Sequence, residues 1–139
     1  LGIDNEGKTS VVITKGNKAN HIILRGGTSG TNYDAKSIND AQELLKKNNL
    51  EPNIVVDCSH GNSNKDHNRQ PIVFNEVIQQ RIDGNEKIIG LMLESNLSEG
   101  NQSLGDNVKE LEYGVSITDK CVGWDKTEET IMESYNILN

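Results

Sequence analysis

The chain has 139 residues, which is long enough for one ordinary domain with a buried core. Its net charge of −7 at pH 7 argues against nucleic acid as a partner, because phosphate backbones attract proteins with an excess of Lys and Arg. No apolar run approaches the roughly 18 residues of a membrane-spanning helix, so we expect no membrane partner either. The two cysteines have no CxxC spacing and no secretory signal is present, which indicates reduced thiols and a cytoplasmic protein.

The N-terminal part of the chain is rich in β-branched residues. Within residues 8–27, the stretch KTSVVITKGNKANHIILRGG holds two β-branched runs separated by a turn at Gly16 and Asn17. This pattern predicts a β-hairpin followed by a strand. We therefore assign residues 1–20 to a hairpin insertion and residues 21–139 to the unit that follows it.

From residue 21 onward, strand-like and helix-like segments alternate along the chain. Short runs rich in Val, Ile and Leu predict strands, and apolar residues at helical spacing predict helices. The predicted strands cover 21–27, 53–60 and 86–95, and the predicted helices cover 34–50, 71–82 and 126–138. Three successive strand–helix units favour a parallel sheet and the α/β class.

The helical segments predict which side chains face the core. The expected inner faces are Ile38, Ala41, Leu44 and Leu45 in the first helix, and Val73, Phe74, Val77 and Ile78 in the second. We expect the first helix to end at Asn49, and Pro71 suits the first turn of the second helix. The first turn of the last helix is rich in Glu, as the helix dipole favours. Residues 96–118 form a polar stretch longer than an ordinary connection, which is typical of functional or disordered loops.

Each predicted strand ends in residues that carry chemistry. Arg25 ends the first strand and is followed by Gly26 and Gly27. His60 ends the second strand, and Glu94 ends the third. In parallel α/β proteins the active site forms at the carboxyl ends of the strands, because the loops that follow them converge there. We therefore expect the three strand ends to meet on one face.

The Arg25 segment has two interpretations. A planar guanidinium binds phosphate well, and glycines let the backbone approach an anion closely. This makes Arg25, Gly26 and Gly27 candidates for an anion-binding site. Alternatively, Arg25 is a surface cation beside a turn.

His60 and Glu94, together with Asp119 in the stretch SITDKCVGW, form a candidate set of metal ligands. Imidazole and carboxylate groups suit Mn, Fe or Zn ions. The alternatives are a structural histidine and a solvated charge at the strand end. Cys58 lies just before His60 and is a weaker candidate ligand, because buried thiols are usually inert.

Four motifs carry a resemblance to a known family. HIILRGG, DCSHGNSNK, LMLESNLSEGNQ and YGVSITDKCVGW occur in the order and spacing of the C-terminal part of class I 3-deoxy-D-arabino-heptulosonate 7-phosphate (DAHP) synthase. The resemblance runs from the hairpin region to the end of the chain. It implies the last three units, about strands six to eight, of a (β/α)₈ TIM barrel, preceded by part of a β-hairpin insertion.

The resemblance also implies a function and roles for single residues. The family enzyme is a transferase of the shikimate pathway of aromatic amino-acid biosynthesis, and it condenses phosphoenolpyruvate with erythrose 4-phosphate to DAHP and phosphate. His60, Glu94 and Asp119 match three of its metal ligands, which implies a divalent Mn, Fe, Zn or Co ion. Arg25 matches an arginine that binds the phosphate of phosphoenolpyruvate. His60 and Asp119 are the implied catalytic residues, and Asp119 also meets a hydroxyl of erythrose 4-phosphate.

Other parts of the family pattern are not in this chain. The family's fourth metal ligand is a cysteine at the end of strand one, and neither Cys58 nor Cys121 matches it. Further basic residues for phosphoenolpyruvate come from earlier strands. We therefore expect a C-terminal fragment that is inactive alone and needs the missing N-terminal part of the same enzyme. The resemblance also implies a homo-oligomer.

Three alternative functions stay open. The related 3-deoxy-D-manno-octulosonate 8-phosphate synthase takes arabinose 5-phosphate, although EGNQ and SITDKCVGW favour the heptulosonate enzyme. A non-catalytic assembly or effector-binding piece is the second, because the hairpin region resembles part of the aromatic amino-acid inhibitor pocket of regulated members. The third is an unrelated metal-dependent hydrolase with the same His/Glu/Asp set, which the Arg-Gly-Gly element disfavours.

Overall fold

A computed structural model describes residues 1–11, 13–17 and 19–138 of the chain. Val12 and Lys18, which belong to the predicted hairpin region, lie outside the described residues. No helix in the described part of the chain has the length and apolar character needed to cross a membrane. The strands are β1 (Gly2–Ile3), β2 (Thr9–Ser10), β3 (Ile22–Leu24), β4 (Ile54–Asp57) and β5 (Ile88–Met92), and the helices are α1 (Ala35–Lys47), α2 (Gln70–Ile82) and α3 (Trp124–Leu138), with 3₁₀ turns η1 (His67–Arg69) and η2 (Val108–Glu110).

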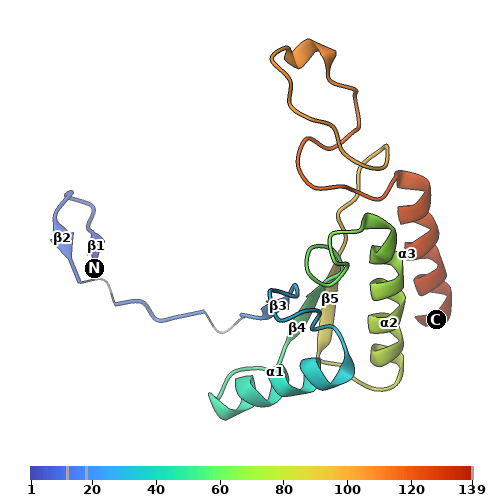
Figure 1. Cartoon of the computed structure of the whole chain (residues 1–139). Coiled ribbons are helices and arrows are strands. Elements are labelled where there is room, and N and C mark those ends of the chain that lie inside the picture. Colours follow the sequence, from blue (N-terminus) through green and yellow to red (C-terminus); the bar gives the residue numbers. More distant parts are fainter. Residues whose placement is uncertain (12, 18, 139) are drawn as a thin grey trace.

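The centre of the molecule is a parallel three-stranded sheet in the order β3-β4-β5 (Figure 1). The predicted alternation of strands and helices and the α/β class are confirmed. The strands are shorter than predicted, because the polar residues at their ends leave the ladder and form loops. β4 is buried along most of its length, as its nearly continuous apolar sequence indicates.

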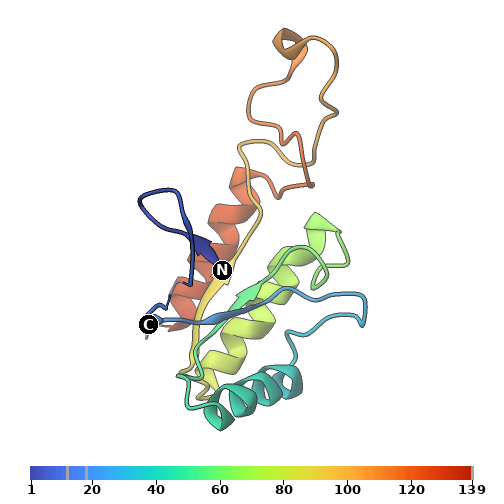
Figure 2. The same ribbon diagram turned by 90° about the vertical axis from the view of Figure 1, so that its left-hand side faces the viewer.

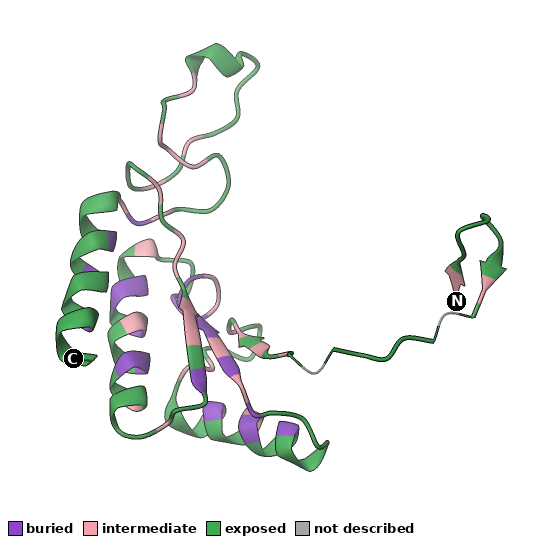
Figure 3. Ribbon diagram, turned by 180° about the vertical axis from the view of Figure 1, so that it is seen from behind, coloured by how far each residue is buried: buried purple, intermediate pink, exposed green. Residues whose placement is uncertain are grey.

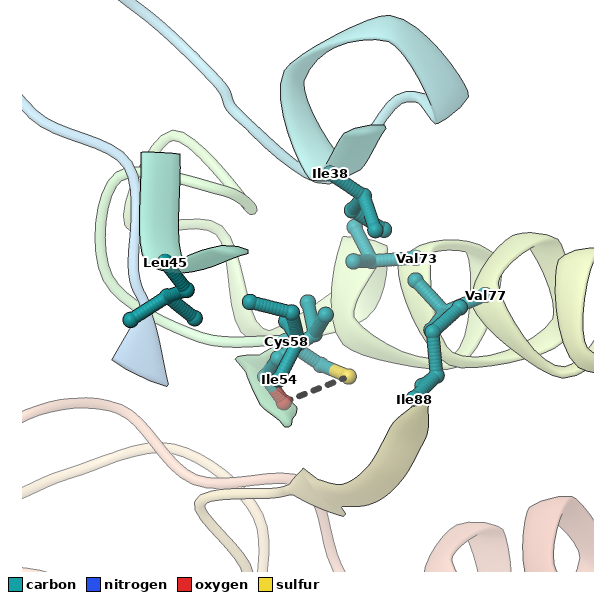
Figure 4. Close-up of a cluster of buried hydrophobic side chains, with 8 residues drawn as sticks. Ile38, Leu45, Ile54, Cys58, Val73, Val77 and Ile88 are labelled. Carbon is teal, nitrogen blue, oxygen red and sulfur yellow. Dashed lines mark hydrogen bonds between the residues drawn. The ribbon is translucent and has the colours of Figure 1, made fainter. Parts of the chain in front are cut away.

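Two helices cover one face of this sheet. Ile38 and Leu45 of α1 and Val73 and Val77 of α2 pack against side chains of β4 and β5 in a single cluster, which also contains Ile54, Val56, Cys58 and Ile88 (Figure 4). Figure 3 shows buried positions, in purple, on α1, α2, β4 and β5. Burial of this apolar surface is the main stabilising term of the fold.

Helix α1 begins where the side chain of Asp34 accepts the backbone N–H of Ser37, a typical N-terminal cap. The helix ends before Asn49, which has a positive φ of 56° and confirms the predicted stop. One predicted core residue of this helix is wrong. Leu44 is 63% exposed, because Leu45 rather than Leu44 lies on the side that meets the sheet.

Helix α3 packs on α2 rather than on the sheet (Figure 1). The buried residues of α3 are small and polar, namely Thr127, Thr130 and Ser134. The helix starts at Trp124, earlier than the predicted Lys126, so the acidic residue of its first turn is Asp125 and the predicted Glu residues fall in later turns. Small side chains allow the two helices to approach closely, which the sequence pattern alone did not indicate.

The N-terminal hairpin differs from the prediction in register. β1 pairs with β2 around a turn from Asp4 to Lys8, and no strand pairing forms around Gly16 in the described residues. The carboxylate of Asp4 accepts the backbone N–H groups of Glu6 and Lys8, and Gly7 has a φ of 81° that favours glycine. These local hydrogen bonds select the earlier turn. The hairpin stands away from the sheet (Figure 1).

The other face of the sheet is uncovered. Ile23 of β3 is 47% exposed and Met92 of β5 is 43% exposed, and both strands have unpaired outer edges within the described residues. Beyond β5, the long loop 95–123 projects past the carboxyl ends of the strands (Figure 2). The predicted candidate residues lie where this loop and the strand ends meet.

Candidate active site at the strand ends

The loop 60–65 follows β4 and forms one wall of the candidate site. Three of its non-glycine residues have a positive φ, namely His60 (46°), Asn64 (54°) and Lys65 (60°). Such backbone conformations cost energy and persist where neighbouring contacts hold them. Here Lys65 donates its backbone N–H to the carbonyl oxygen of His60 at 2.8 Å. The loop therefore turns back on itself and keeps His60 at the end of the strand.

The imidazole ring of His60 is held on one side by two neighbours. Its Nδ1 atom lies 2.8 Å from Oδ2 of Asp57 and 2.7 Å from the hydroxyl oxygen of Ser59. Oδ1 of Asp57 accepts both the backbone N–H of Ser59, at 2.8 Å, and its hydroxyl, at 2.6 Å. The side chain of Asp57 is 5% exposed and that of His60 is 25% exposed. The ring is thus fixed at Nδ1, while Nε2 faces the open side of the site.

Glu94 enters the site from the end of β5. The buried side chain of Gln70, at the start of α2, accepts the backbone N–H of Glu94 at 2.8 Å and donates to its carbonyl oxygen at 3.4 Å. Burial raises the pKa of the Glu94 carboxyl above its ordinary value, and the nearby carboxylates of Asp119 and Asp57 act in the same direction. His60 opposes this shift. A nearby cation would stabilise the charged form of a carboxylate in such surroundings.

Asp119 comes from the long loop and is more exposed, with 62% of its side chain accessible. The loop is anchored to the strand end by backbone hydrogen bonds from Val122 to Glu94, at 2.9 Å, and between Gly100 and Cys121. The side chain of Asn101 donates to the carbonyl oxygen of Thr118 at 2.8 Å. These contacts bring Asp119 to the strand ends although its own side chain is solvated.

The three candidate metal ligands converge. His60 Nε2 lies 3.3 Å from Oε1 of Glu94 and 3.7 Å from Oδ2 of Asp119, and the three donor atoms all lie within 4.8 Å of one another. Two ligand atoms that each lie about 2.0–2.2 Å from a single ion are separated by roughly 3.0–4.3 Å. The separations of 3.3 Å and 3.7 Å match the spacing of atoms that bind one ion. One imidazole and two carboxylates could hold a divalent Mn, Fe, Co or Zn ion.

Arg25 lies beside this group. It is exposed and lines one hollow together with Gly26, Gly27, His60 and Asp119, and with Thr28, Gly61 and Lys65. The predicted convergence of the three strand ends is therefore present in the structure. The site combines an exposed cation with a cluster of metal-type donors.

The two glycines after Arg25 differ in their surroundings. Gly26 has a φ of 68°, and a Cβ atom there would lie 2.6 Å from the backbone of Gly61. A Cβ atom on Gly27 would meet nothing within 4 Å. The lack of a side chain at Gly26 thus lets two strand-end loops touch, whereas Gly27 leaves open space at the hollow.

A second link joins these loops. Asn62 is fully buried, and its amide donates to the carbonyl oxygens of Leu24, at 3.0 Å, and Asp57, at 2.9 Å. Its side-chain oxygen accepts the backbone N–H of Asn32 at 2.8 Å. Asn62 therefore fixes the end of β3, where Arg25 lies, against the end of β4.

Comparison with known proteins identifies the relatives of this arrangement. The sequence profile of the DAHP synthetase I family matches residues 3–132, almost the whole chain. The chain belongs to the DAHP synthetase I family. The family resemblance predicted from the four motifs is thereby confirmed.

Individual members of the family are similar over all or nearly all of this chain. The Tyr-sensitive phospho-2-dehydro-3-deoxyheptonate aldolase of Escherichia coli is 45% identical over 139 residues, which is 100% of this chain and 39% of the relative. The phenylalanine-inhibited enzyme of Saccharomyces cerevisiae is 42% identical and covers 94% of this chain and 37% of its own length. The chain therefore spans less than two fifths of the length of these family members.

A solved structure from the same family has the same fold. The phospho-2-dehydro-3-deoxyheptonate aldolase of Francisella tularensis superposes with a TM-score of 0.83 and 42% sequence identity. The match covers 96% of this chain and 38% of that chain. The similarity thus includes nearly all of this chain, with its sheet and helices.

Cys58 does not join the candidate site. Its side chain is fully buried in the core, where the thiol lies 3.9 Å from the carbonyl oxygen of Val56 (Figure 4). Burial raises the pKa of this thiol to about 12. The interpretation as inert packing is correct, because the side chain points into the helix-covered side of the sheet rather than toward His60.

Several residues near the site were not predicted as functional. A second hollow of about 210 Å³ is lined by His60, Glu94 and Asp119 and also by Lys65, His67, Gln70 and Lys120. Gln70 and Asn62 act through buried hydrogen bonds that join segments distant in sequence, and no local pattern reveals such bonds. Asp57 had a sequence signal, since it is a charged residue at the end of a buried strand, close in sequence to His60.

Proposed function

We propose that this chain supplies the metal-binding and phosphate-binding part of a DAHP synthase. The observation that carries the proposal is the convergence of His60, Glu94 and Asp119 at the carboxyl ends of parallel strands, with Arg25 at the same hollow. The family membership of the chain supports this assignment. The reaction is the condensation of phosphoenolpyruvate with erythrose 4-phosphate, in which C3 of phosphoenolpyruvate bonds to the aldehyde carbon, water adds at C2 and phosphate leaves.

Each residue has a distinct task in this proposal. His60, Glu94 and Asp119 hold a divalent Mn, Fe, Zn or Co ion, which when bound supplies a Lewis acid for the aldehyde oxygen. Arg25 pairs with the phosphate of phosphoenolpyruvate, because a guanidinium donates two parallel hydrogen bonds to phosphate oxygens. The exposed carboxylate of Asp119 is also able to accept a hydrogen bond from a hydroxyl of erythrose 4-phosphate.

We further propose that the sheet is one segment of a (β/α)₈ barrel. Its helices lie on one face only, its other face is uncovered and both edges are unpaired in the described residues. Closure of a barrel removes strand edges and fills the inner face with side chains. The remaining strands would then come from outside this chain and bring further ligands. In this arrangement, the N-terminal hairpin forms part of a binding site for an aromatic amino-acid inhibitor, in keeping with the Tyr-sensitive and phenylalanine-inhibited relatives.

Metal binding by the chain itself is the first test. We expect Mn²⁺ to bind the 139-residue chain, as followed by electron paramagnetic resonance, and His60→Ala to abolish this binding. His21→Ala is the matched control, because His21 is an exposed histidine at the amino end of β3. Equal Mn²⁺ binding by the His60→Ala and His21→Ala variants would contradict the proposed ligand set.

Catalysis requires a second experiment. The chain replaces the matching C-terminal part of the Escherichia coli Tyr-sensitive relative, and phosphate release from phosphoenolpyruvate is measured with erythrose 4-phosphate or arabinose 5-phosphate. We expect activity with erythrose 4-phosphate, and a much higher phosphoenolpyruvate requirement after Arg25→Ala than after Lys109→Ala, an exposed cation on the distant loop. Activity with arabinose 5-phosphate alone would assign the octulosonate reaction instead.

A further inference from the structure

Asp57 is the most buried charged side chain next to the candidate site, and the proposed chemistry does not use it. Its side chain is 5% exposed, yet it forms no ion pair with Lys or Arg in the described part of the chain. Both of its carboxylate oxygens point at the His60 segment, Oδ1 at Ser59 and Oδ2 at the imidazole. Burying a charged carboxylate costs free energy of desolvation, which only its hydrogen-bond partners offset. The contacts of Asp57 with Ser59 and His60 therefore point to a role for this residue.

The hydrogen bonds fix the position of the proton on the His60 ring. A carboxylate only accepts hydrogen bonds, and the Ser59 hydroxyl already donates to Oδ1 of Asp57. The 2.8 Å contact between Oδ2 and Nδ1 therefore requires the ring proton to lie on Nδ1. The lone pair of a neutral imidazole is then on Nε2, the atom that faces Glu94 and Asp119.

We propose that Asp57 is a positioning residue that, with Ser59, holds His60 in the Nδ1–H tautomer and aims its Nε2 lone pair at the cation site. This inference rests on the proposed function, because it assigns Nε2 to a metal. Metal-bound histidines commonly donate their second N–H to a carboxylate, and loss of that partner lowers metal affinity about 10- to 100-fold. Every group of this arrangement comes from the segment 57–60 of this chain.

The backbone supports this task. The positive φ of His60 turns the backbone back after β4, and this turn places the imidazole ring beside the carboxylate of Asp57. The carbonyl oxygen of Asp57 accepts the amide of the fully buried Asn62, so the residue is tied at both its main chain and its side chain. Asp57 therefore has little freedom to move away from the ring.

The first readout is the tautomer itself in the metal-free chain. Long-range ¹⁵N–¹H spectra of the imidazole rings, recorded above the pH range in which histidine titrates, show which nitrogen carries the proton. We expect Nδ1–H for His60 in the wild-type chain. In Asp57→Asn we expect the Nε2–H form to appear, because an amide is able to donate as well as accept. An unchanged tautomer in this isosteric variant would overturn the inference.

The second readout is Mn²⁺ affinity, with Asp66→Asn as the matched control. Asp66 lies in the same segment and is half exposed, and it caps η1 instead of contacting His60. We expect Asp57→Asn to weaken Mn²⁺ binding about 10- to 100-fold and Asp66→Asn to leave it unchanged. Equal affinities in the two variants would overturn the role of Asp57 in metal binding.

The two readouts separate this inference from the proposed function. A wild-type chain that binds no Mn²⁺ would contradict the proposed metal site, while the tautomer spectra would still decide whether Asp57 orients His60. If Asp57→Asn fails to fold, Ser59→Ala takes its place. This variant removes the hydroxyl that holds Oδ1, and we expect a smaller change of tautomer in the same direction.

Discussion

His60 and Asp119 reach the same site from two regions of opposite character. His60 follows β4, the central strand, whose core-facing side chains are buried under α1 and α2, and its ring is held by the nearly buried Asp57. Asp119 lies on the long loop 95–123, is 62% exposed and depends on hydrogen bonds between loop segments. The site therefore has one wall fixed by the core and one wall held by backbone hydrogen bonds of the loop, including one to Glu94 at the strand end. In the proposed metal site, the strand-borne ligands would set the position of a cation and the loop would complete its coordination.

The largest expected effect tests the stability of these two regions. Ile54→Ala removes a fully buried side chain from the core, and we expect it to lower the free energy of unfolding by about 2–5 kcal/mol. Leu104→Ala in the loop removes a side chain that is 61% exposed and should change it by less than about 0.5 kcal/mol. Urea denaturation followed by circular dichroism measures both. Similar losses would show that the loop is as tightly packed as the body.

The next effect concerns the contact between two strand-end loops. We expect Gly26→Ala to lower the free energy of unfolding by about 1–3 kcal/mol, because its Cβ would clash with Gly61 and its φ is positive. Gly27→Ala is the control, since the space around it is open. The same denaturation experiment applies, and two equally stable variants would contradict the close contact.

A smaller effect should separate binding from stability. Gln102 donates to the carbonyl oxygens of Glu112 and Val115 and accepts the N–H of Glu112, so it holds the loop together. We expect Gln102→Ala to weaken Mn²⁺ binding roughly fivefold, equivalent to about 1 kcal/mol, with little change in melting temperature. Gln79→Ala on the exposed surface of α2 serves as control. A lower melting temperature without a change in Mn²⁺ affinity would mean that the loop does not position Asp119.

The smallest effect on stability at neutral pH concerns the thiols. Burial raises the pKa of Cys58 from 9.0 to about 12, so the folded chain keeps a proton that the unfolded chain releases. This contribution to stability is fully present below about pH 9 and is lost as the pH rises toward 12. In Cys58→Ala the alkaline loss of stability should shrink.

The two thiols should also differ in reactivity. We expect iodoacetamide to modify the partly exposed Cys121 and to spare Cys58 in the native chain, as mass spectrometry would show.

The sequence predicted the three strand–helix units better than the N-terminal hairpin. The short apolar strands and the helical spacing of Ile38 and Leu45 carry strong local signals, and all three strand–helix units are present. The hairpin register was wrong, because two competing glycine turns look alike in sequence. The side chain of Asp4, which accepts two backbone N–H groups, stabilises the earlier turn.

The amino-acid sequence by itself determined the class of the fold, the family and the candidates Arg25, His60, Glu94 and Asp119, because strand ends and motif order are local properties. Tertiary structure alone decided how these residues are held. Contacts such as Gln70 with Glu94 and Gly26 with Gly61 join segments that are far apart along the chain. The contact between Asp57 and His60 is short in sequence, but it also depends on the backbone turn after β4. Their separation along the chain does not by itself show that the carboxylate meets the imidazole ring.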